Sequence, residues 1–523
     1  MNEHPLFAPA IYNLVDEIEQ FAATEKIALC VVNEHGDEQK ITYKALLQQA
    51  NQVANAFMNA QLKKGDRILI MLPRSVEAYT TYIGALKAGL TIIACSDQLR
   101  TRDVDYRIRH AEASAIVIHD RFLRNFEGSE AMKTIQQFIV GEESNHERYL
   151  SNLTNEASTI FENVKTKRED LAFISYTSGT TGTPKGAMHY HGWAYAHIRT
   201  TAKAWLNIHE NNLVWGTAAP GWQKWIWTPF LAALGMGATA FVYTGKFEPE
   251  RYLQLIEQYR IEVLCCTPTE YRMMMKQETF GTYEYTYLKS VVSAGEPLNR
   301  EVIERFFERY QLYIRDGYGQ TENTLLIGTL SDEPLKIGSM GKPTPGNHVE
   351  IIDGFGEVIA PNQVGDIAVH IETPALFRGY YREPERTAMQ FRGDWYVTGD
   401  RAYKDEDGYF WFSGRADDMI ISAGYTIGPF DIEEALLKHP LVQECAVVAS
   451  PDEERGSVVK AFIVLKDWSL TKQEGMKEQL QNFVKATIAP YSYPRKIEFL
   501  EELPKTMSGK IRRYELRMRE QAK

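Results

Sequence analysis

The feature that constrains this chain most is a loop rich in glycine and hydroxyl side chains that follows a short apolar run. Residues 171–174 (LAFI) have the character of a buried strand, and they lead into YTSGTTGTPKG at residues 176–186. Glycines let backbone N–H groups approach an anion closely, and a lysine adds positive charge. We therefore expect a phosphate-binding loop that contains Thr177, Ser178, Gly179, Thr180, Thr181, Gly182 and Lys185.

The spacing of this loop differs from the Walker pattern, in which the lysine directly follows a glycine. Here Thr183 and Pro184 separate Gly182 from Lys185. A flexible surface loop is the simpler alternative. The buried strand before the loop and the helix-like stretch after it favour a phosphate site.

Composition and charge argue against several classes of protein. The 523 residues suffice for two or more domains, and a net charge of −11 without a long basic run gives no support for binding nucleic acid or an anionic membrane. The uncharged stretch 225–245 contains one proline and several glycines, so we expect a buried helix and strand there and no integral membrane segment. No signal peptide is evident. The cysteines form no CxxC pair and predict reduced thiols in a cytoplasmic protein: Cys30, Cys95, Cys265, Cys266 and Cys445.

Helical and strand patterns alternate along the first two thirds of the chain, which predicts a parallel α/β architecture. Thr42 is a plausible N-cap, because apolar residues recur behind it at helical spacing. Residues 125–168 are polar and resemble a connection. The expected strands are 67–72, 90–95, 114–118, 171–174, 212–215, 239–243, 262–265, 290–293 and 312–315, and the expected helices include 75–88 and 103–111.

The pattern changes near residue 347, where short alternating segments separated by Gly, Pro and Asp indicate a small β-rich unit. A last unit, with both helical and strand patterns, begins near Asp417. We therefore predict an α/β protein with a large N-terminal domain (1–416) of parallel-sheet subdomains. This domain includes a β-rich subdomain at about 347–416, and a small α+β C-terminal domain (417–523) follows it.

Two further motifs follow predicted strands. SAGEPL (293–298) is a turn that lets the backbone approach a flat ligand, and DGYGQTE (316–322) supplies three different groups. Tyr318 offers a ring to stack on a purine, and Thr321 offers a hydroxyl to a phosphate. Glu322 offers a carboxylate of the kind that binds Mg²⁺ together with substrate phosphates. Ordinary polar turns are the alternative for both segments.

Four short motifs follow: TGD (398–400), GRADD (414–418), AGYT (423–426) and the basic PKTMSGKIRR (504–513). Each is weak alone, because Gly-Asp turns and basic tails are common. In this order, and together with the phosphate loop, they resemble the adenylate-forming (AMP-binding) superfamily. Stretches such as GALKAG (84–89) look closest to its medium- and branched-chain acyl-CoA synthetases. The resemblance covers nearly the whole chain.

The resemblance implies roles for individual residues. Lys510 would be the catalytic lysine, acting with Thr321 and Glu322, and Glu322 would hold Mg²⁺. Asp400 would accept hydrogen bonds from the ribose, and Arg415 would reach the ribose or a phosphate. The other residues expected to bind ATP, besides those of the phosphate loop, are Gly295, Glu296, Pro297, Asp316, Gly317, Tyr318, Gly319 and Gln320.

The C-terminal domain would be a mobile lid. Asp417 matches the hinge position, and Gly424 and Tyr425 would contact CoA. Thr426 departs from the family pattern, because many acyl-CoA synthetases carry Arg there, so any phosphate contact made by that Arg is in doubt.

The implied reaction has two steps. A carboxylate attacks the α-phosphate of ATP to give acyl-AMP and pyrophosphate, and the thiol of CoA then takes the acyl group. ATP, Mg²⁺ and CoA are therefore the expected cofactors and co-substrates, and a small carboxylic acid is the expected partner. A homodimer is compatible with the sequence.

The acyl group is expected to be short to medium in length, or branched. Relatives that activate acetate close the pocket with a Trp at the position of Gly319, so a deeper pocket is expected here. Trp222, Trp225 and Trp227 lie in a segment that relatives use near the acyl site and could form its walls. Plain core packing is as good an explanation for any one of them.

Three alternatives stay open at this stage. The first is an acetate or propionate–CoA ligase. The second is a stand-alone adenylation enzyme that loads an acid onto a carrier protein. The third is a nucleotide-binding regulator without catalysis, which the presence of both Glu322 and Lys510 argues against.

Overall fold

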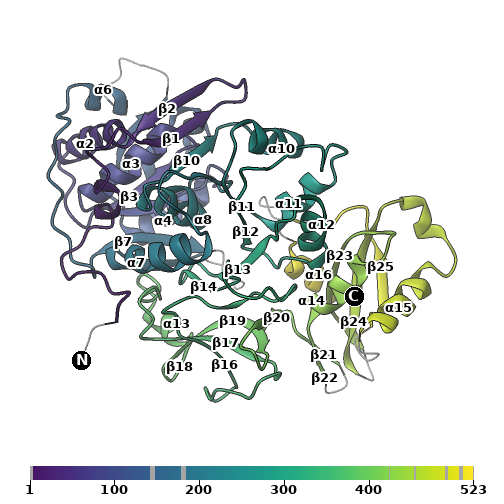
Figure 1. Cartoon of the computed structure of the whole chain (residues 1–523). Coiled ribbons are helices and arrows are strands. Elements are labelled where there is room, and N and C mark those ends of the chain that lie inside the picture. Colours follow the sequence, from purple (N-terminus) through teal and green to yellow (C-terminus); the bar gives the residue numbers. More distant parts are fainter. Residues whose placement is uncertain are drawn as a thin grey trace.

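The computed structural model describes residues 4–141, 148–177, 184–422, 425–452, 455–488, 493–505 and 511–521. Within these residues, the strands form five sheets. Figure 1 shows a large N-terminal body, a β-rich subdomain below it and a small C-terminal domain at one side. The predicted α/β class is confirmed. Among the described helices, none is long and apolar enough to cross a lipid bilayer.

A six-stranded sheet forms one half of the body, with all neighbouring strands parallel except the last pair. Its order is β6 (Gln136–Val140), β5 (Ala115–His119), β3 (Arg67–Met71), β4 (Thr91–Ala94), β7 (Leu171–Thr177) and β8 (Lys185–Tyr190). Thr42 caps α2 as predicted, since its side chain accepts a hydrogen bond from Ala45 N–H. The helices of this half are α2 (Tyr43–Asn59), α3 (Val76–Lys87), α4 (Thr101–Ala111), α5 (Asp120–Leu123), η1 (Arg124–Phe126), η2 (Met132–Thr134) and α6 (Leu150–Asn155).

A nine-stranded sheet forms the other half, with six parallel strands in its middle and antiparallel strands at both ends. Its order is β15 (Lys342–Pro343), β14 (Leu325–Gly328), β13 (Arg315–Gly319), β12 (Ser290–Ala294), β11 (Val263–Cys266), β9 (Leu213–Gly216), β10 (Thr239–Tyr243), β1 (Ile27–Val32) and β2 (Glu38–Thr42). The helices of this half are α1 (Asp16–Glu19), α7 (His191–His197), the π-helical η3 (Ile198–Trp205), α8 (Gln223–Trp225), the π-helical η4 (Ile226–Ala232), α9 (Ala233–Gly235), α10 (Pro249–Gln258), α11 (Pro268–Met275) and α12 (Arg300–Tyr310). One apolar core joins the two halves, because it contains Ile70, Val214 and Phe230.

The phosphate-loop segment joins two strands, so the expectation of a helix directly after it is wrong. β8 runs antiparallel to β7, with Thr177 opposite Lys185. Ala187 and His189 are buried on alternate positions of β8, a period that suits a strand. The helix α7 begins only after β8. Residues 178–183 of the loop lie outside the described residues.

The strand expected at residues 312–315 lies further along the chain, at Arg315–Gly319. Half of the DGYGQTE segment is therefore strand and not loop. Its glycines disguise the strand, because glycine disfavours strands in general. Close packing explains one of them, since a Cβ on Gly317 would lie 2.4 Å from the Trp205 ring. The polar segment 125–168 also contains an unexpected edge strand, β6, and a short helix, α6.

The β-rich subdomain is an antiparallel five-stranded sheet. It contains β16 (Val349–Ile352), β17 (Gly365–His370), β18 (Phe391–Arg392), β19 (Trp395–Lys404) and β20 (Phe410–Arg415), with the helix α13 (Pro384–Ala388) beside it. The TGD motif lies inside β19. Gly399 has φ +76°, a left-handed conformation that other residues rarely adopt, so glycine suits the middle position of the motif.

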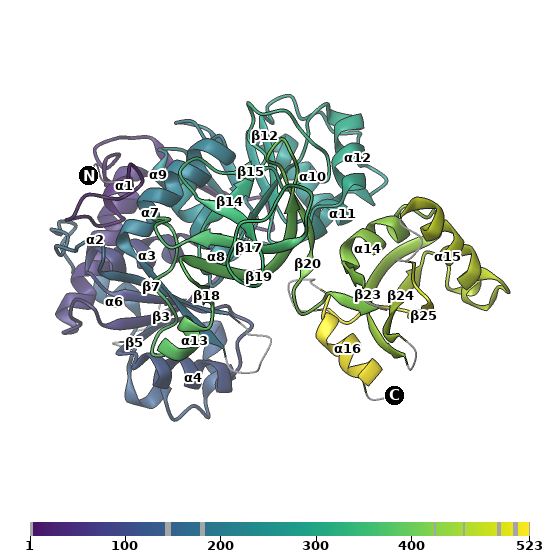
Figure 2. The ribbon, with the colours of Figure 1, turned by 90° about the horizontal axis from the view of Figure 1, so that it is seen from below.

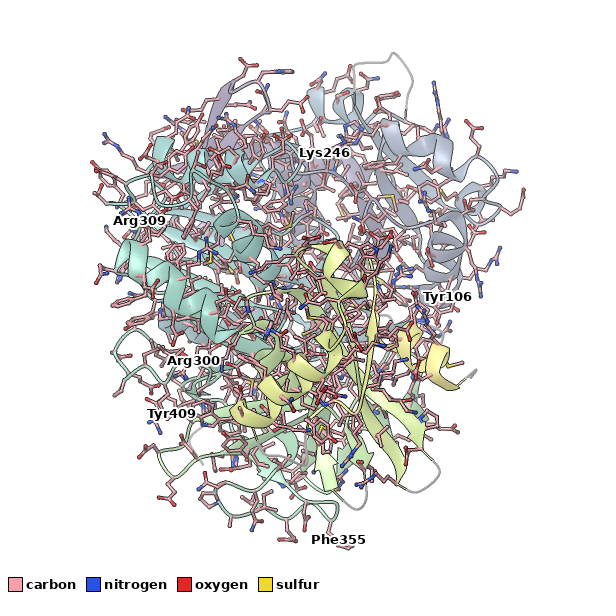
Figure 3. All side chains as sticks on the ribbon, turned by 90° about the vertical axis from the view of Figure 1, so that its right-hand side faces the viewer. Tyr106, Lys246, Arg300, Arg309, Phe355 and Tyr409 are labelled. Carbon is pink, nitrogen blue, oxygen red and sulfur yellow. The ribbon has the colours of Figure 1, made fainter. Side chains whose placement is uncertain are left out.

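The C-terminal domain has its own apolar core. Figure 2 shows it as a separate lobe beside β20, and Figure 3 shows it in front of the β-rich subdomain. Phe412 and Phe430 meet across the junction, with ring centroids 5.7 Å apart. The elements of the domain are β21 (Ile420–Ser422), β22 (Tyr425–Ile427), α14 (Pro429–Leu437), β23 (Val442–Asp452), β24 (Gly456–Leu465), η5 (Trp468–Lys472), α15 (Met476–Thr487), β25 (Lys496–Phe499) and α16 (Arg513–Gln521).

A substitution in the β7–β8 hairpin tests this packing. A Cβ on Gly186 would lie 2.7 Å from Cγ2 of Ile174, so Gly186→Ala should cost about 1–3 kcal/mol of unfolding free energy through overpacking. Gly354→Ala is the matched control, because a Cβ there meets no atom within 4 Å. Urea unfolding of the two variants measures the difference. Equal stability of both variants would contradict the close approach of β8 to β7.

Candidate functional site

Segments from the three sheets of the N-terminal domain meet at one place. β12 and β13 are parallel neighbours, with Ala294 paired to Gly317, so the AGEPL turn and the end of DGYGQTE leave the same edge of the nine-stranded sheet. β19 joins them from the β-rich subdomain through Asp400. β8 joins them from the six-stranded sheet through Lys185. This convergence explains how motifs far apart in the sequence can share a site.

Asp400 is the centre of the first polar network. Its side chain is buried, and Oδ2 accepts hydrogen bonds from Tyr318 Oη (2.7 Å) and Gln320 Nε2 (2.6 Å). Arg415 Nε lies 3.2 Å from Oδ1. Burial raises the pKa of Asp400, and Arg415, Tyr318 and Gln320 partly oppose that rise. The hydroxyl of Tyr318 is therefore used to hold Asp400, which fixes the ring expected to stack on a purine.

Glu322, Tyr380 and Lys185 form the second polar network. Tyr380 Oη donates to Glu322 Oε1 at 2.8 Å and accepts from Lys185 Nζ at 3.0 Å. Glu322 and Tyr380 are both buried. Burial lowers the pKa of Lys185, and the negative charge of Glu322 opposes that change. Sequence reasoning missed Tyr380, which reaches this place because residue 380 pairs with Ala187 of β8.

A stripe of three side chains holds the loop after β13. His189, Trp193 and His197 are spaced four residues apart, at the end of β8 and along α7. Trp193 Nε1 donates to the carbonyl oxygen of Asn323 at 3.0 Å. His189 Nε2 bonds to the carbonyl oxygen of Thr321. The stripe therefore fixes the backbone on both sides of Glu322.

The two histidines of the stripe are neutral, because burial lowers the pKa of each to about 4. His197 Nε2 must donate to the carbonyl oxygen of Trp227 (2.9 Å), since a carbonyl only accepts. Its Nδ1 then accepts from Thr324 Oγ1 at 2.7 Å. The repeat of ring residues every fourth position was visible in the sequence, but its partners in the loop after β13 were not.

Asp316 carries a buried carboxyl group near the start of the strand β13. Its Oδ1 accepts from the backbone N–H of Gly317 at 2.8 Å. Burial raises its pKa to about 7, and this hydrogen bond and Lys224 oppose the rise only in part. A large fraction of the Asp316 side chains is therefore protonated at neutral pH.

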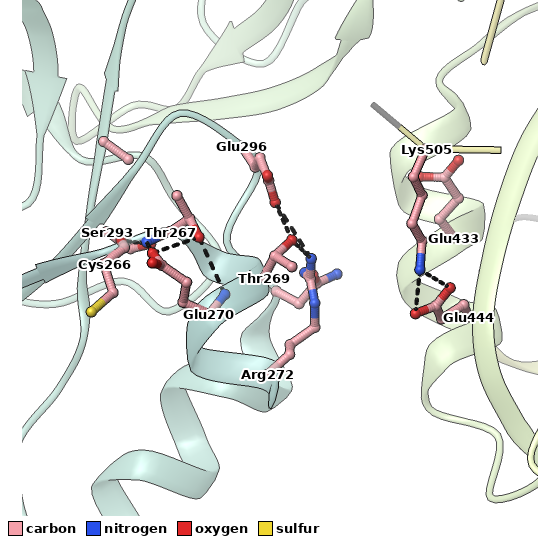
Figure 4. A network of polar contacts seen from close by, with 12 residues as sticks. Cys266, Thr267, Thr269, Glu270, Arg272, Ser293, Glu296, Glu433, Glu444 and Lys505 are labelled. Carbon is pink, nitrogen blue, oxygen red and sulfur yellow. Dashed lines mark hydrogen bonds and ion pairs between the residues drawn. The ribbon is translucent and has the colours of Figure 1, made fainter. Parts of the chain in front are cut away.

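The side chain of Glu296 is held by a neighbouring helix. Figure 4 shows its contacts with Thr269 and Arg272 of α11, where Thr269 Oγ1 donates to Oε2 at 2.7 Å. Arg272 also donates to Asn299 Oδ1 at 3.0 Å, which fixes the far end of the turn. Pro297 is exposed. The side chain of Glu296 therefore braces the AGEPL turn through Oε2, and the nucleotide contacts expected of Glu296 and Pro297 stay predictions.

The tryptophans expected near the acyl site have different surroundings. Trp225 is buried in the apolar core, where its ring packs against Tyr79, Tyr82 and Phe230. Trp222 is 42% exposed. The placement of Trp225 favours the core-packing explanation for that residue. Its neighbour Trp227 is the one that faces Gly319.

Gly319 and Trp227 are in close approach. A Cβ on Gly319 would lie 3.0 Å from Trp227 Cη2 and 2.2 Å from the carbonyl oxygen of Thr324. The carbonyl group of Thr324 and the indole of Trp227 therefore border the place where a side chain at position 319 would extend. The deeper acyl pocket expected from Gly319 stays a prediction.

Asp417 lies between two arginines at the junction of the domains. Arg415 Nε is 3.7 Å from Oδ1 of Asp417, and Arg517 of α16 is 3.6 Å from Oδ2. Arg517 also pairs with Asp418. The C-terminal helix therefore contacts the segment where the resemblance places the hinge.

Several expected site residues lie outside the part of the chain that the structure describes. They are Ser178, Gly179, Thr180, Thr181, Gly182, Gly424 and Lys510, together with the side chains of Tyr425 and Thr426.

Comparison with known proteins agrees with this geometry. The family model for AMP-binding enzymes matches residues 18–381, and the model for the C-terminal domain of AMP-binding enzymes matches residues 431–510. The acyl-CoA ligase YtcI of Bacillus subtilis (strain 168) is 53% identical over 100% of this chain and 98% of its own length. The mitochondrial acyl-coenzyme A synthetase ACSM3 of Rattus norvegicus is 39% identical over 98% of this chain and 91% of its own length.

A solved structure shares the fold over nearly the whole chain. The anthranilate CoA ligase AuaEII, crystallised in complex with anthranoyl-AMP, superposes with a TM-score of 0.90 at 27% identity and covers 98% of each chain. The chain therefore belongs to the AMP-binding enzyme family, and it is an AMP-forming acyl-CoA synthetase that uses ATP, CoA and a small carboxylic acid.

Proposed function

We propose that this synthetase activates short- to medium-chain carboxylic acids, including branched ones. The contact between Gly319 and Trp227 carries this proposal. Trp227 lies in the segment that relatives use near the acyl site, and its indole borders Gly319 of β13. An indole wall of this kind suits an aliphatic tail of limited length. Discrimination per methylene in an apolar pocket is only about 1–3 kcal/mol, so several acids should be accepted.

In the first step, a carboxylate oxygen of the acid bonds to the α-phosphorus of ATP. The bond from that phosphorus to the bridging oxygen breaks, and pyrophosphate leaves. Both reactants are anions, which repel by about 4 kcal/mol per charge pair at 4 Å and an effective dielectric of 20. We assign Lys510 to the approaching carboxylate and α-phosphate, and Lys185 and the loop 177–183 to the leaving pyrophosphate. Positioning and electrostatics then supply most of the acceleration.

Mg²⁺ is expected to bind at Glu322. The donor set fits, because Glu322 is a buried carboxylate of which one oxygen accepts a hydrogen bond from Tyr380. Mg²⁺ commonly binds one or two carboxylates together with substrate phosphates. When bound there, Mg²⁺ would neutralise phosphate charge. Thr321 stands beside it and would donate its hydroxyl to a phosphate.

The nucleoside part of ATP is assigned to the first network. Asp400 and Arg415 would face the ribose, and the β12 and β13 ends, including Gly295, Gly317 and Gln320, would face the base. The support is the convergence of these segments at one sheet edge. Asp316 would sit near the base as a carboxyl that is partly neutral.

In the second step, the sulfur of CoA bonds to the acyl carbon of acyl-AMP, AMP leaves and the thiol proton passes to solvent. We propose that the C-terminal domain (417–523) rotates about Asp417 between the steps. Its support is the narrow junction at β20 and the charged contacts that surround Asp417. The assignments of Gly424 and Tyr425 to CoA, and the cytoplasmic location, stay predictions.

The substrate class is tested by competition among acids. The enzyme is given Mg-ATP, CoA and an equimolar mixture of acetate, propionate, isobutyrate, isovalerate, hexanoate, octanoate and benzoate, and mass spectrometry measures each acyl-CoA. We expect products of the aliphatic acids longer than propionate to dominate. Acetyl-CoA as the main product would contradict the proposal, and benzoyl-CoA would shift the class to aryl acids. Pyrophosphate release without any acyl-CoA would favour loading of a carrier protein.

Trp227→Leu should move the preference toward longer acids. Removing the indole opens volume beside Gly319, so the ratio of kcat/KM for decanoate to that for butyrate should rise roughly tenfold or more. Trp225→Leu is the matched control, since Trp225 packs in the core and its loss should lower stability while leaving that ratio unchanged. An unchanged ratio in Trp227→Leu would remove Trp227 from the acyl site.

Lys510→Ala should separate the two steps. Loss of the lysine should slow ATP–pyrophosphate exchange by about 10²–10³-fold, as for other groups that stabilise developing charge. Formation of acyl-CoA from supplied acyl-AMP should be little changed, because that step needs no charge on the α-phosphate. Equal losses in both assays would contradict the assignment of Lys510.

Asp316→Asn should change how stability depends on pH. The folded-state pKa of about 7 exceeds the value near 3.9 of an unfolded Asp, so the folded state holds a proton that the unfolded state has lost. The stability that this group contributes is complete below about pH 4 and declines as pH rises through about 7. The unfolding free energy of Asp316→Asn relative to that of the wild type should rise by about 1–4 kcal/mol from pH 5 to pH 8. Urea unfolding at both pH values measures the gain.

The exposed Asp394→Asn is the control for the Asp316 experiment and should show no such gain. A parallel response of the two variants would mean that burial does not perturb Asp316.

A further inference from the structure

The hydroxyl of Tyr380 stands between two opposite charges. It accepts a hydrogen bond from Lys185 Nζ at 3.0 Å and donates its proton to Glu322 Oε1 at 2.8 Å. A phenol has one proton to give and lone pairs to receive, so a single hydroxyl serves both groups at once. Lys185 and Glu322 are thereby linked without touching each other.

The ring of Tyr380 also contacts the lysine, and the residue is held firmly in place. Lys185 Nζ lies 4.6 Å from the ring centroid, a distance at which the face of the ring attracts a cation. The backbone N–H of Tyr380 donates to Thr387 Oγ1 at 2.9 Å, and residue 380 pairs with Ala187 of β8. The side chain is 2% exposed. Tyr380 therefore has no room to swing aside.

Direct pairing of Lys185 with Glu322 would work against ATP binding. Opposite unit charges 4 Å apart attract by about 4 kcal/mol at an effective dielectric of 20. Glu322 is buried, and its surroundings of low dielectric strengthen its attraction to an ammonium, so a direct ion pair would compete with an incoming ligand. A direct ion pair would take the ammonium of Lys185 away from phosphate oxygens and the carboxylate of Glu322 away from a cation.

We propose that Tyr380 is a positioning residue that keeps Lys185 and Glu322 from pairing directly and presents both to a metal–triphosphate ligand. The inference rests on the proposed function, in which Lys185 faces the pyrophosphate and Glu322 faces Mg²⁺. Tyr380 itself touches neither the acid nor the α-phosphate in this account. Its hydroxyl acts through the two residues that it separates.

Tyr380→Phe is the sharpest variant, because it removes one oxygen and keeps the ring that packs against Lys185. We expect the KM for Mg-ATP in ATP–pyrophosphate exchange to rise by tenfold or more, and acyl-CoA formation from supplied acyl-AMP to stay at the wild-type rate. Calorimetric titration with Mg-ATP in the absence of acid should show the same loss of affinity. A crystal structure of the variant should show Lys185 in direct contact with Glu322.

Tyr381→Phe is the matched control. It is the next residue of the chain, it lies against His110 instead of the charged pair, and it should bind Mg-ATP like the wild type. The double variant Tyr380→Phe/Glu322→Gln provides a second test that does not depend on metal. Without the charge of Glu322, Lys185 loses the carboxylate with which it would pair, so affinity for metal-free ATP should recover relative to Tyr380→Phe.

Wild-type affinity for Mg-ATP in a folded Tyr380→Phe enzyme would overturn the inference. So would equal losses in both half-reactions, or no recovery in the double variant, because either would indicate general damage to the site. Failure of the proposed function looks different, since the wild type itself would then form no acyl-CoA from the expected acids.

Discussion

Two buried carboxylates, Asp400 and Glu322, set the constraint on which the rest of the site depends. A buried charge without partners costs several kcal/mol, so each must find donors within reach. The donors for Asp400 come from the strands β13 and β20, and the donor for Glu322 comes from the segment beside β8. These pairings can form together only when the nine-stranded sheet, the β-rich subdomain and the β7–β8 hairpin adopt one arrangement. Charge compensation thus ties the three sheets together where a substrate would bind.

The C-terminal domain also contains ion pairs, one of them exposed and one of them buried. Lys505 contacts Glu444 at 2.7 Å on its surface, whereas Arg513 contacts the buried Glu433 at 2.5 Å. Exposed pairs contribute only about 0–1 kcal/mol and can be exchanged at little cost, whereas the buried pair fixes α16 to α14. The same helix contacts Asp417 through Arg517. A rotation at Asp417 would therefore change the contacts of the helix that directly follows Lys510, which couples the proposed hinge to the proposed catalytic residue.

The sequence supported the fold class because its strands and helices have clear periods, as in α3 and β5, and because Thr42 caps a helix through local contacts alone. It misplaced β13, since Gly317 there serves a close approach to Trp205 that only the tertiary structure reveals. It could not rank Trp225 against Trp227, because both indoles belong to one apolar core and only the tertiary structure brings Trp227 next to Gly319. Tyr380 lay beyond sequence reasoning altogether, because its partners are 58 and 195 positions away along the chain.

The most direct test is a crystal structure with a non-hydrolysable acyl-AMP analogue. We expect the ribose hydroxyls to bind Asp400, the base to lie beside the ends of β12 and β13, and the acyl chain to end against Trp227. Tyr318 and Gln320 should keep their hydrogen bonds to Asp400. A nucleotide bound away from Asp400, or an acyl chain that never reaches Trp227, would contradict these assignments.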